Sequence, residues 1–136
     1  MTSKKDLSVL KQKSIRKKLA LAKTYLSSAK NSLKAGDFRL AADAAYNGLE
    51  LAMKAALLLK TDKLPKRHGG VAQLFSLLYV KEKILDASYG KKIGRAFALR
   101  NKARYDEEAV VIQADARENI SLAEDVVDFI DKIVRE

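Results

Sequence analysis

The sequence has no cysteine, no tryptophan, one proline, one histidine and six glycines. Because cysteine is absent, the chain can form no disulfide, no thiolate metal site and no cysteine nucleophile. The lone histidine has no acidic cluster at ligand spacing beside it, so we expect neither a metal site nor a cofactor. With glycine and proline scarce, the abundant alanine, leucine, lysine, glutamate and arginine favour helices over strands.

Long hydrophobic runs are also missing. The most apolar stretch, Leu49 to Leu59, contains Glu50 and Lys54. It falls well short of the roughly 20 apolar residues of a membrane-spanning helix. The lysines near the N-terminus are not followed by the apolar run of a secretory signal. We therefore expect a cytoplasmic protein without membrane segments, and its 136 residues fit one domain.

The net charge of +10 is distributed unevenly along the chain. The segments carry net charges of +9 (residues 1–36), +2 (37–70), +6 (71–105) and −7 (106–136). A basic surface attracts polyanions such as nucleic acids. The alternative is a solvated surface whose lysines pair with the acidic C-terminal helix, and charge alone favours this second interpretation.

Apolar residues recur with helical periodicity near both ends of the chain. In the first strong helix they are spaced 4-3-4-3-4 and form one stripe: Ile15, Leu19, Ala22, Leu26, Ala29 and Leu33. The same spacing predicts a last helix over about Gln113 to Arg135. After the first helix, Gly36 suits a left-handed C-cap and the Asp37 carboxylate can cap the next helix. Such a tight turn makes these two helices antiparallel neighbours.

Three more helices are predicted in the middle of the chain. The first spans about Phe38 to Lys60 and is expected to be the most buried, and Thr61 to Gly70 reads as a loop. A short amphipathic helix follows from Val71 to Tyr79. After a break at Gly90, a further helix runs from about Lys91 to Arg104.

These elements define an all-α fold. We expect an up-and-down antiparallel bundle of four main helices plus one short helix. Residues 1–13 are lysine-rich with weak periodicity and are expected to form a basic N-terminal extension. Residues 14–136 then form the bundle domain.

One charged residue interrupts an apolar stripe. Arg100 follows Ile93 and Phe97 at helical spacing and therefore shares their core-facing stripe. A buried arginine must either reach solvent or have an anionic partner. One interpretation is an internal ion pair with Glu50 or Asp106. The other is a polar site near a helix end, made of Arg100, Asn101, Arg104, Tyr105 and Asp106.

Five short segments in a characteristic order point to a known family. They are residues 25–30 (YLSSAK), 33–38 (LKAGDF), 41–46 (AADAAY), 66–71 (KRHGGV) and 100–106 (RNKARYD). Over about residues 20–135 the chain resembles the HEPN domain, the higher eukaryotes and prokaryotes nucleotide-binding family. The resemblance implies a helical bundle, commonly a homodimer, and for many members a metal-independent ribonuclease of toxin–antitoxin or antiviral systems. Many members are encoded beside a small nucleotidyltransferase that can act as the antitoxin.

The resemblance also assigns residues. In its ribonuclease members, an arginine followed by a polar residue steadies the phosphate, and a histidine a few positions later acts on the ribose 2′-hydroxyl. Arg100 and Asn101 match the first two, but Tyr105, Asp106 and Glu107 occupy the positions open to the histidine. The chain is similar to a subset that ends Arg-x-x-Ala-x-Tyr-Asp and lacks this histidine. By this resemblance Arg100 and Tyr105 are candidate catalytic residues, and binding extends to Asn101, Arg104 and Asp106.

Three functions stay open. The favoured one is a nucleotide- or RNA-binding module that forms a toxin–antitoxin-like pair with a nucleotidyltransferase. The second is a metal-independent endoribonuclease, although histidine supplies proton transfer near neutral pH far better than a tyrosine that titrates near ~10. The third is a structural dimer or adaptor without ligand, in which Arg100 forms an ion pair. His68, in the loop before the short helix, is expected to be structural and to cap that helix.

Overall fold

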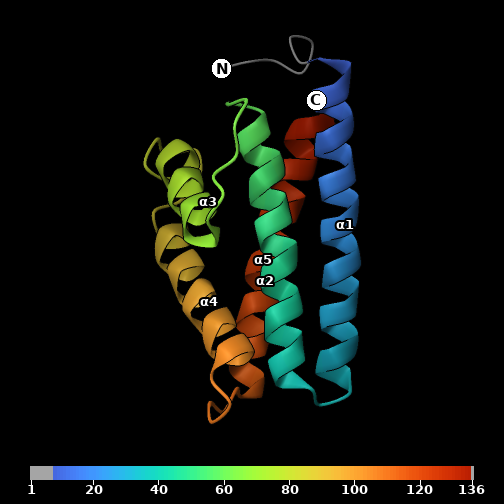
Figure 1. Cartoon of the computed structure of the whole chain (residues 1–136), viewed down its shortest axis with the longest axis vertical. Helices are drawn as coiled ribbons and strands as arrows, with labels where there is room; N and C mark the ends of the chain where they lie inside the picture. The colour runs from blue at the N-terminus through green and yellow to red at the C-terminus, as the bar shows by residue number, and fades with distance from the viewer. Residues whose placement is uncertain (1–7, 136) are drawn as a thin grey trace.

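The computed structural model describes residues 8–135, and five α-helices and one π-helical turn make up its regular structure (Figure 1). The helices are α1 (Val9–Lys34), α2 (Phe38–Leu58), α3 (His68–Phe75), α4 (Ser88–Tyr105) and α5 (Gln113–Arg135). The π-helical turn, η2, spans Ser76–Val80 and continues α3. The described residues contain no strand, which confirms the all-α prediction.

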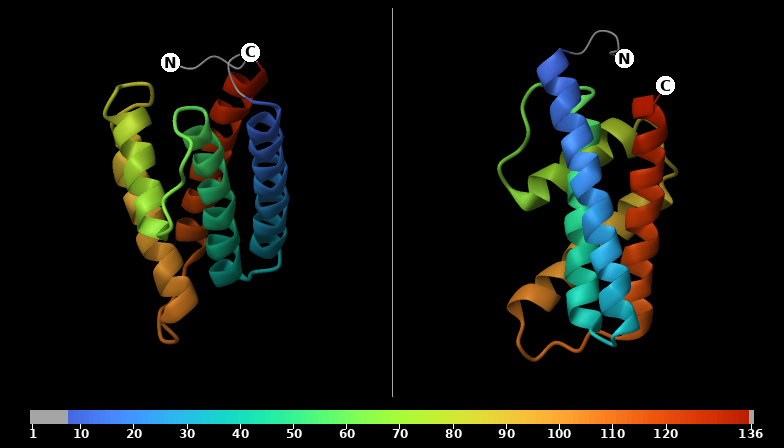
Figure 2. Two further views of the ribbon diagram at one scale, coloured as in Figure 1. Left: turned by 45° about the horizontal axis from the view of Figure 1, so that its top comes forward. Right: turned by 90° about the vertical axis from the view of Figure 1, so that its right-hand side faces the viewer.

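The four long helices run alternately up and down, and the short α3 lies beside α2 and α4 (Figures 1 and 2). The α1–α2 turn and the loop between α4 and α5 lie at one end of the bundle. The start of α1 and the end of α5 lie at the other end. Residues 1–7, most of the predicted extension, are outside the described part, and α1 already begins at Val9.

The turn between α1 and α2 agrees with the prediction in one respect and differs in another. Gly36 has φ +82°, the left-handed conformation expected of a residue that ends a helix. Asp37 occupies the N-cap position of α2, but its carboxylate makes no hydrogen bond to the backbone of the helix. The prediction of a side-chain cap is wrong because Asp37 (φ −89°, ψ 71°) lacks the extended conformation that aims an N-cap side chain at the helix.

Helix α2 is the central element of the core, as its periodicity predicts. Its small residues allow its neighbours to approach closely. A Cβ atom added to Gly48 would lie 3.0 Å from the carbonyl oxygen of Ala22 on α1, so the crossing of α1 and α2 requires glycine. The buried positions of α2 include Ala45, Tyr46, Leu49, Ala52, Met53, Ala56 and Leu57.

The glycines in the middle of the chain do not interrupt helices as predicted. Gly69 and Gly70 lie in the first turn of α3 rather than in the preceding loop. A Cβ on Gly70 would come within 3.0 Å of Pro65 Cβ, so close packing by that proline explains this glycine. Gly90 lies inside α4, where a Cβ atom would make only an ordinary contact of 3.6 Å with Val80, so the helix simply accepts a propensity cost of about 1 kcal/mol. No helix among residues 8–135 is long and apolar enough to cross a membrane.

Candidate functional site

Arg100 lies on the inner face of α4, among the apolar side chains of the bundle. Only 2% of its surface is exposed. Its Nη1 donates a hydrogen bond to Oδ1 of Asn101 at 2.9 Å. Nε and Nη2 have no hydrogen-bond acceptor among the described residues.

The structure does not support an internal ion pair, which is one of the two interpretations of this arginine. No ion pair of Arg100 occurs in the described part of the chain. Glu50 instead pairs with Lys54 at 3.3 Å, and Asp106 lies beyond the end of α4. The guanidinium is therefore a buried cation whose Nε–Nη2 edge is unused. That edge is the one with which arginine binds carboxylates and phosphates through two parallel bonds.

Tyr105 and Asn101 accompany Arg100 at the C-terminal end of α4. The ring centre of Tyr105 lies 5.7 Å from Cζ of Arg100, and 69% of the tyrosine surface is exposed. The structure therefore brings together three of the five predicted binding residues. In this group, one amide accepts a hydrogen bond from the guanidinium and one exposed aromatic ring lies near it.

Arg104 and Asp106, the other two predicted residues, have their main partners outside this group, although Tyr105 also contributes to the raised pKa of Arg104. Arg104 donates from Nε and Nη2 to both carboxylate oxygens of Asp43 on α2, at 3.1 and 3.0 Å. This hydrogen bonding raises the pKa of Arg104 above its ordinary value. The carboxylate of Asp106 accepts a hydrogen bond from the backbone N–H of Glu108 at 3.0 Å, which closes a local turn.

Arg39 was not predicted and fixes the end of α4. Its Nη1 donates to the carbonyl oxygens of Ala103 at 2.8 Å and Asp106 at 2.9 Å, and its Nη2 donates to the carbonyl of Ala109. The last carbonyls of a helix have no partner within the helix, so this guanidinium replaces the missing donors. Arg39 and the ion pair between Arg104 and Asp43 together hold the end of α4, which carries Tyr105. Arg39 and Asp43 lie one turn apart, but their partners, backbone carbonyls for Arg39 and the Arg104 side chain for Asp43, are distant in the sequence and leave no pattern there.

Tyr46 of α2 is a second missed residue, because it reads as one more apolar position. It is fully buried, its ring centre lies 5.7 Å from that of Phe97, and its hydroxyl has no hydrogen-bond partner. Burial and then the charge of Glu50 raise the pKa of this hydroxyl, while the charge of Arg100 lowers it. Tyr46 therefore stays protonated and lies within electrostatic reach of Arg100.

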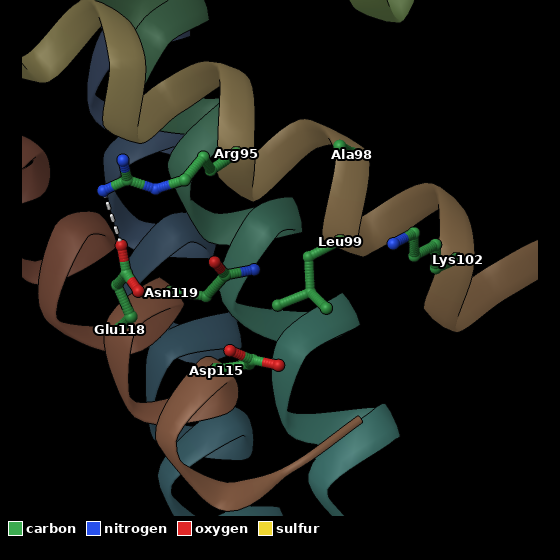
Figure 3. A pocket seen from close by; sticks show the side chains of 7 residues that line it. All are labelled: Arg95, Ala98, Leu99, Lys102, Asp115, Glu118 and Asn119. Atoms are coloured by element: carbon green, nitrogen blue, oxygen red, sulfur yellow. Dashed lines mark hydrogen bonds and ion pairs between the residues drawn. The ribbon is translucent and has the colours of Figure 1, made fainter. Parts of the chain in front are cut away.

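A groove between α4 and α5 is the other notable feature of α4, and Figure 3 shows its lining. It has a volume of about 250 Å³, and Arg95 pairs with Glu118 across it at 2.9 Å. The lining residues are Arg95, Ala98, Leu99, Lys102, Asp115, Glu118 and Asn119. Helical spacing puts Ala98 and Lys102 on the side of α4 opposite Arg100. The groove is therefore separate from the arginine site.

The basic surface is partly neutralised by the acidic C-terminal helix. Lys23 and Lys30 of α1 pair with Asp131 and Glu124 of α5, at 3.0 and 3.2 Å. Within the described residues, no group of three or more histidine or carboxylate side chains could hold a metal ion. The side chain of His68 lies outside the described part, so its structural role stays a prediction.

The fold and the arginine site define the class of this protein as an antiparallel helical bundle with a buried basic residue at the end of one helix. Comparison with known proteins then gives the family. The model of the HEPN domain matches residues 15–133. A protein of Methanocaldococcus jannaschii named "Putative toxin MJ0605" is 34% identical over 118 residues, which cover 87% of each chain. The chain belongs to the HEPN domain family.

Proposed function

We propose that this chain is a toxin-like HEPN module that binds phosphate groups of RNA or of a nucleotide at Arg100. The observation that carries the proposal is the buried guanidinium whose Nε and Nη2 have no acceptor. A buried charge without a partner is costly, and proteins keep such groups mainly where a ligand or a partner uses them. The name of the M. jannaschii relative supports the toxin-like character.

Each neighbouring side chain has a role in this proposal. Asn101 accepts from Nη1 and so fixes the plane of the guanidinium, which leaves the Nε–Nη2 edge for two phosphate oxygens. Tyr105 offers an exposed ring on which a nucleobase can stack. Arg104 and Asp106 act less directly, by anchoring the end of α4 and the turn after it.

RNA binding by two matched variants tests this proposal. Arg100→Met removes the buried cation, and Arg16→Met removes one exposed cation of α1 with the same change in net charge. With a labelled single-stranded RNA at low salt, we expect Arg100→Met to weaken binding about tenfold or more, and Arg16→Met to have a small effect. Equal losses in both variants, or no binding by the unmodified chain, would contradict the proposal.

A ribonuclease is the second candidate, because Tyr105, at one of the three positions open to the missing histidine, has its ring centre 5.7 Å from Cζ of Arg100. Incubation of the same RNA in EDTA separates cleavage from binding. Cleavage that persists in EDTA and disappears in both Arg100→Met and Tyr105→Phe favours the enzyme. Intact RNA with retained binding favours the binding module.

The proposal includes partners. We propose a homodimer and a nucleotidyltransferase-domain partner, as the family resemblance implies. Sedimentation of the purified chain over a range of concentrations tests the homodimer. Co-expression with a nucleotidyltransferase encoded beside the gene tests the pair. A complex that survives gel filtration and prevents RNA binding is the expected result, and separate elution contradicts the pairing.

A further inference from the structure

Three buried polar atoms without a partner lie at the contact between α2 and α4. They are Oη of Tyr46 and Nε and Nη2 of Arg100. In the described part of the chain, no other buried side-chain nitrogen or oxygen lacks a hydrogen bond. All three carry hydrogen that can be donated. A cluster of unused donors, contributed by two helices, needs an acceptor-rich group to complete it.

The two residues are neighbours through Phe97. The ring of Phe97 packs against that of Tyr46 at 5.7 Å, and Arg100 follows Phe97 by about one turn on the same face of α4. The charge of Arg100 also reaches the Tyr46 hydroxyl. Glu50 also faces this region from α2. It pairs with Lys54 at 3.3 Å, but its charge still acts on the Tyr46 hydroxyl, and more strongly than that of Arg100.

Both side chains are closed off from solvent, with exposed fractions of 0% for Tyr46 and 2% for Arg100. Tyr105, which is mostly exposed, lies over the guanidinium and is the side chain that can move aside. A ligand that uses all three donors must therefore insert a small group between α2 and α4. A chain that continues on both sides of that group cannot reach all three donors.

We propose that Tyr46 and Arg100 form an inner anion subsite that takes a terminal phosphate monoester. This inference rests on the proposed function and specifies its ligand. A terminal phosphate has three free oxygens, so two accept from the Nε–Nη2 edge and the third accepts from the Tyr46 hydroxyl. A phosphodiester within an RNA chain has two free oxygens and a substituent on each side, so it can accept from the Nε–Nη2 edge but cannot also accept from the Tyr46 hydroxyl.

Calorimetric titration with small probes tests this subsite. The probes are adenosine 5′-monophosphate, inorganic phosphate and the phosphodiester adenylyl-(3′→5′)-adenosine. The variant is Tyr46→Phe, which keeps the charge and the ring. The control is Tyr79→Phe, the same change at a buried tyrosine whose hydroxyl already donates to the Ala56 carbonyl at 2.7 Å.

Loss of a hydrogen bond to a charged group predicts that Tyr46→Phe weakens binding of the monophosphate about tenfold. Binding of the phosphodiester should stay unchanged in Tyr46→Phe, and Tyr79→Phe should leave both unchanged. Unchanged affinity of Tyr46→Phe for the monophosphate and for inorganic phosphate overturns the subsite. An equal loss for monophosphate and phosphodiester also overturns it.

Two RNA probes then identify where the phosphate comes from. A 5′-phosphorylated oligonucleotide that binds more tightly than its 5′-hydroxyl counterpart, with the difference lost in Tyr46→Phe, assigns an RNA end. Tight binding of the monophosphate without such a difference assigns a free nucleotide. If Arg100→Met loses RNA binding while Tyr46→Phe changes nothing, the subsite fails and the proposed function stands. If the unmodified chain binds none of these probes, both fail.

Discussion

The unpartnered hydroxyl of Tyr46 leads to an unusual prediction: its removal should stabilise the protein. A buried hydroxyl without a hydrogen bond costs about 1–3 kcal/mol, because it loses its bonds to water and gains none. Tyr46→Phe keeps the ring that packs against Phe97 and removes only this oxygen. We therefore expect the free energy of unfolding of the ligand-free protein to rise by about 1–2 kcal/mol.

Tyr79→Phe is the matched control. Tyr79 is also buried, but its hydroxyl donates to the carbonyl of Ala56 at 2.7 Å. Loss of one satisfied hydrogen bond should lower the free energy of unfolding by about 0.5–1.5 kcal/mol. The same chemical change at two buried tyrosines is thus expected to act in opposite directions.

Urea unfolding followed by circular dichroism measures both changes in the same experiment. The transition midpoints should shift in opposite directions while the slopes stay the same, since neither variant changes the surface exposed on unfolding. If Tyr46→Phe lowers stability as much as Tyr79→Phe, the Tyr46 hydroxyl is hydrogen-bonded in the folded protein. That result would refute the reasoning behind the inner subsite.

Three further predictions concern the supports of the site and its titration. Arg39→Met should lower the free energy of unfolding by about 2 kcal/mol through loss of charged donors to backbone carbonyls. Amide hydrogen exchange should then accelerate at residues 102–112 and not in α1. The stability of Arg39→Lys should lie between those of Arg39→Met and the unmodified chain. Because the Arg104–Asp43 pair is partly exposed, Arg104→Met should cost less than about 1 kcal/mol in urea unfolding. Burial raises the pKa of Tyr79 from 10.0 to about 12, so the folded state holds this proton more tightly than the unfolded state. The contribution of Tyr79 to the free energy of unfolding should therefore be fully present below pH 10 and be lost as the pH rises towards 12. Over this range the free energy of unfolding should fall less steeply in Tyr79→Phe than in the unmodified chain.

The sequence predicts most of the fold because apolar periodicity reports directly on helix faces. The stripe from Ile15 to Leu33 lies in α1, and the predicted limits of α5 agree with the structure. Two of the errors fall at Gly70 and Gly90, which lie inside helices instead of ending them, and only Gly70 has a close neighbour that explains the glycine. A sequence pattern cannot show whether a glycine ends a helix or packs inside one, because a neighbour such as Pro65 is set by tertiary packing.

The candidate site was predictable only in part. The position of Arg100 on an apolar stripe indicates its burial, and its short separation from Tyr105 indicates their proximity. The sequence left open an ion pair of Arg100 with an acid such as Glu50 or Asp106. It could not decide between this and a ligand site, because the distance between two helices depends on how all their side chains pack. The roles of Arg39, Asp43 and Tyr46 were missed for the same reason, since each depends on contact between α2 and α4.

The central claim is that the Nε–Nη2 edge of Arg100 binds phosphate, and its Nε–H signal in a nitrogen–proton NMR spectrum tests this most directly. The signal can be assigned by its absence in Arg100→Met. On titration with adenosine 5′-monophosphate or RNA, it should move strongly as a charge-assisted hydrogen bond forms, while the Nε–H signal of exposed Arg16 changes little. An Arg100 signal that stays in place while the ligand binds would contradict the account.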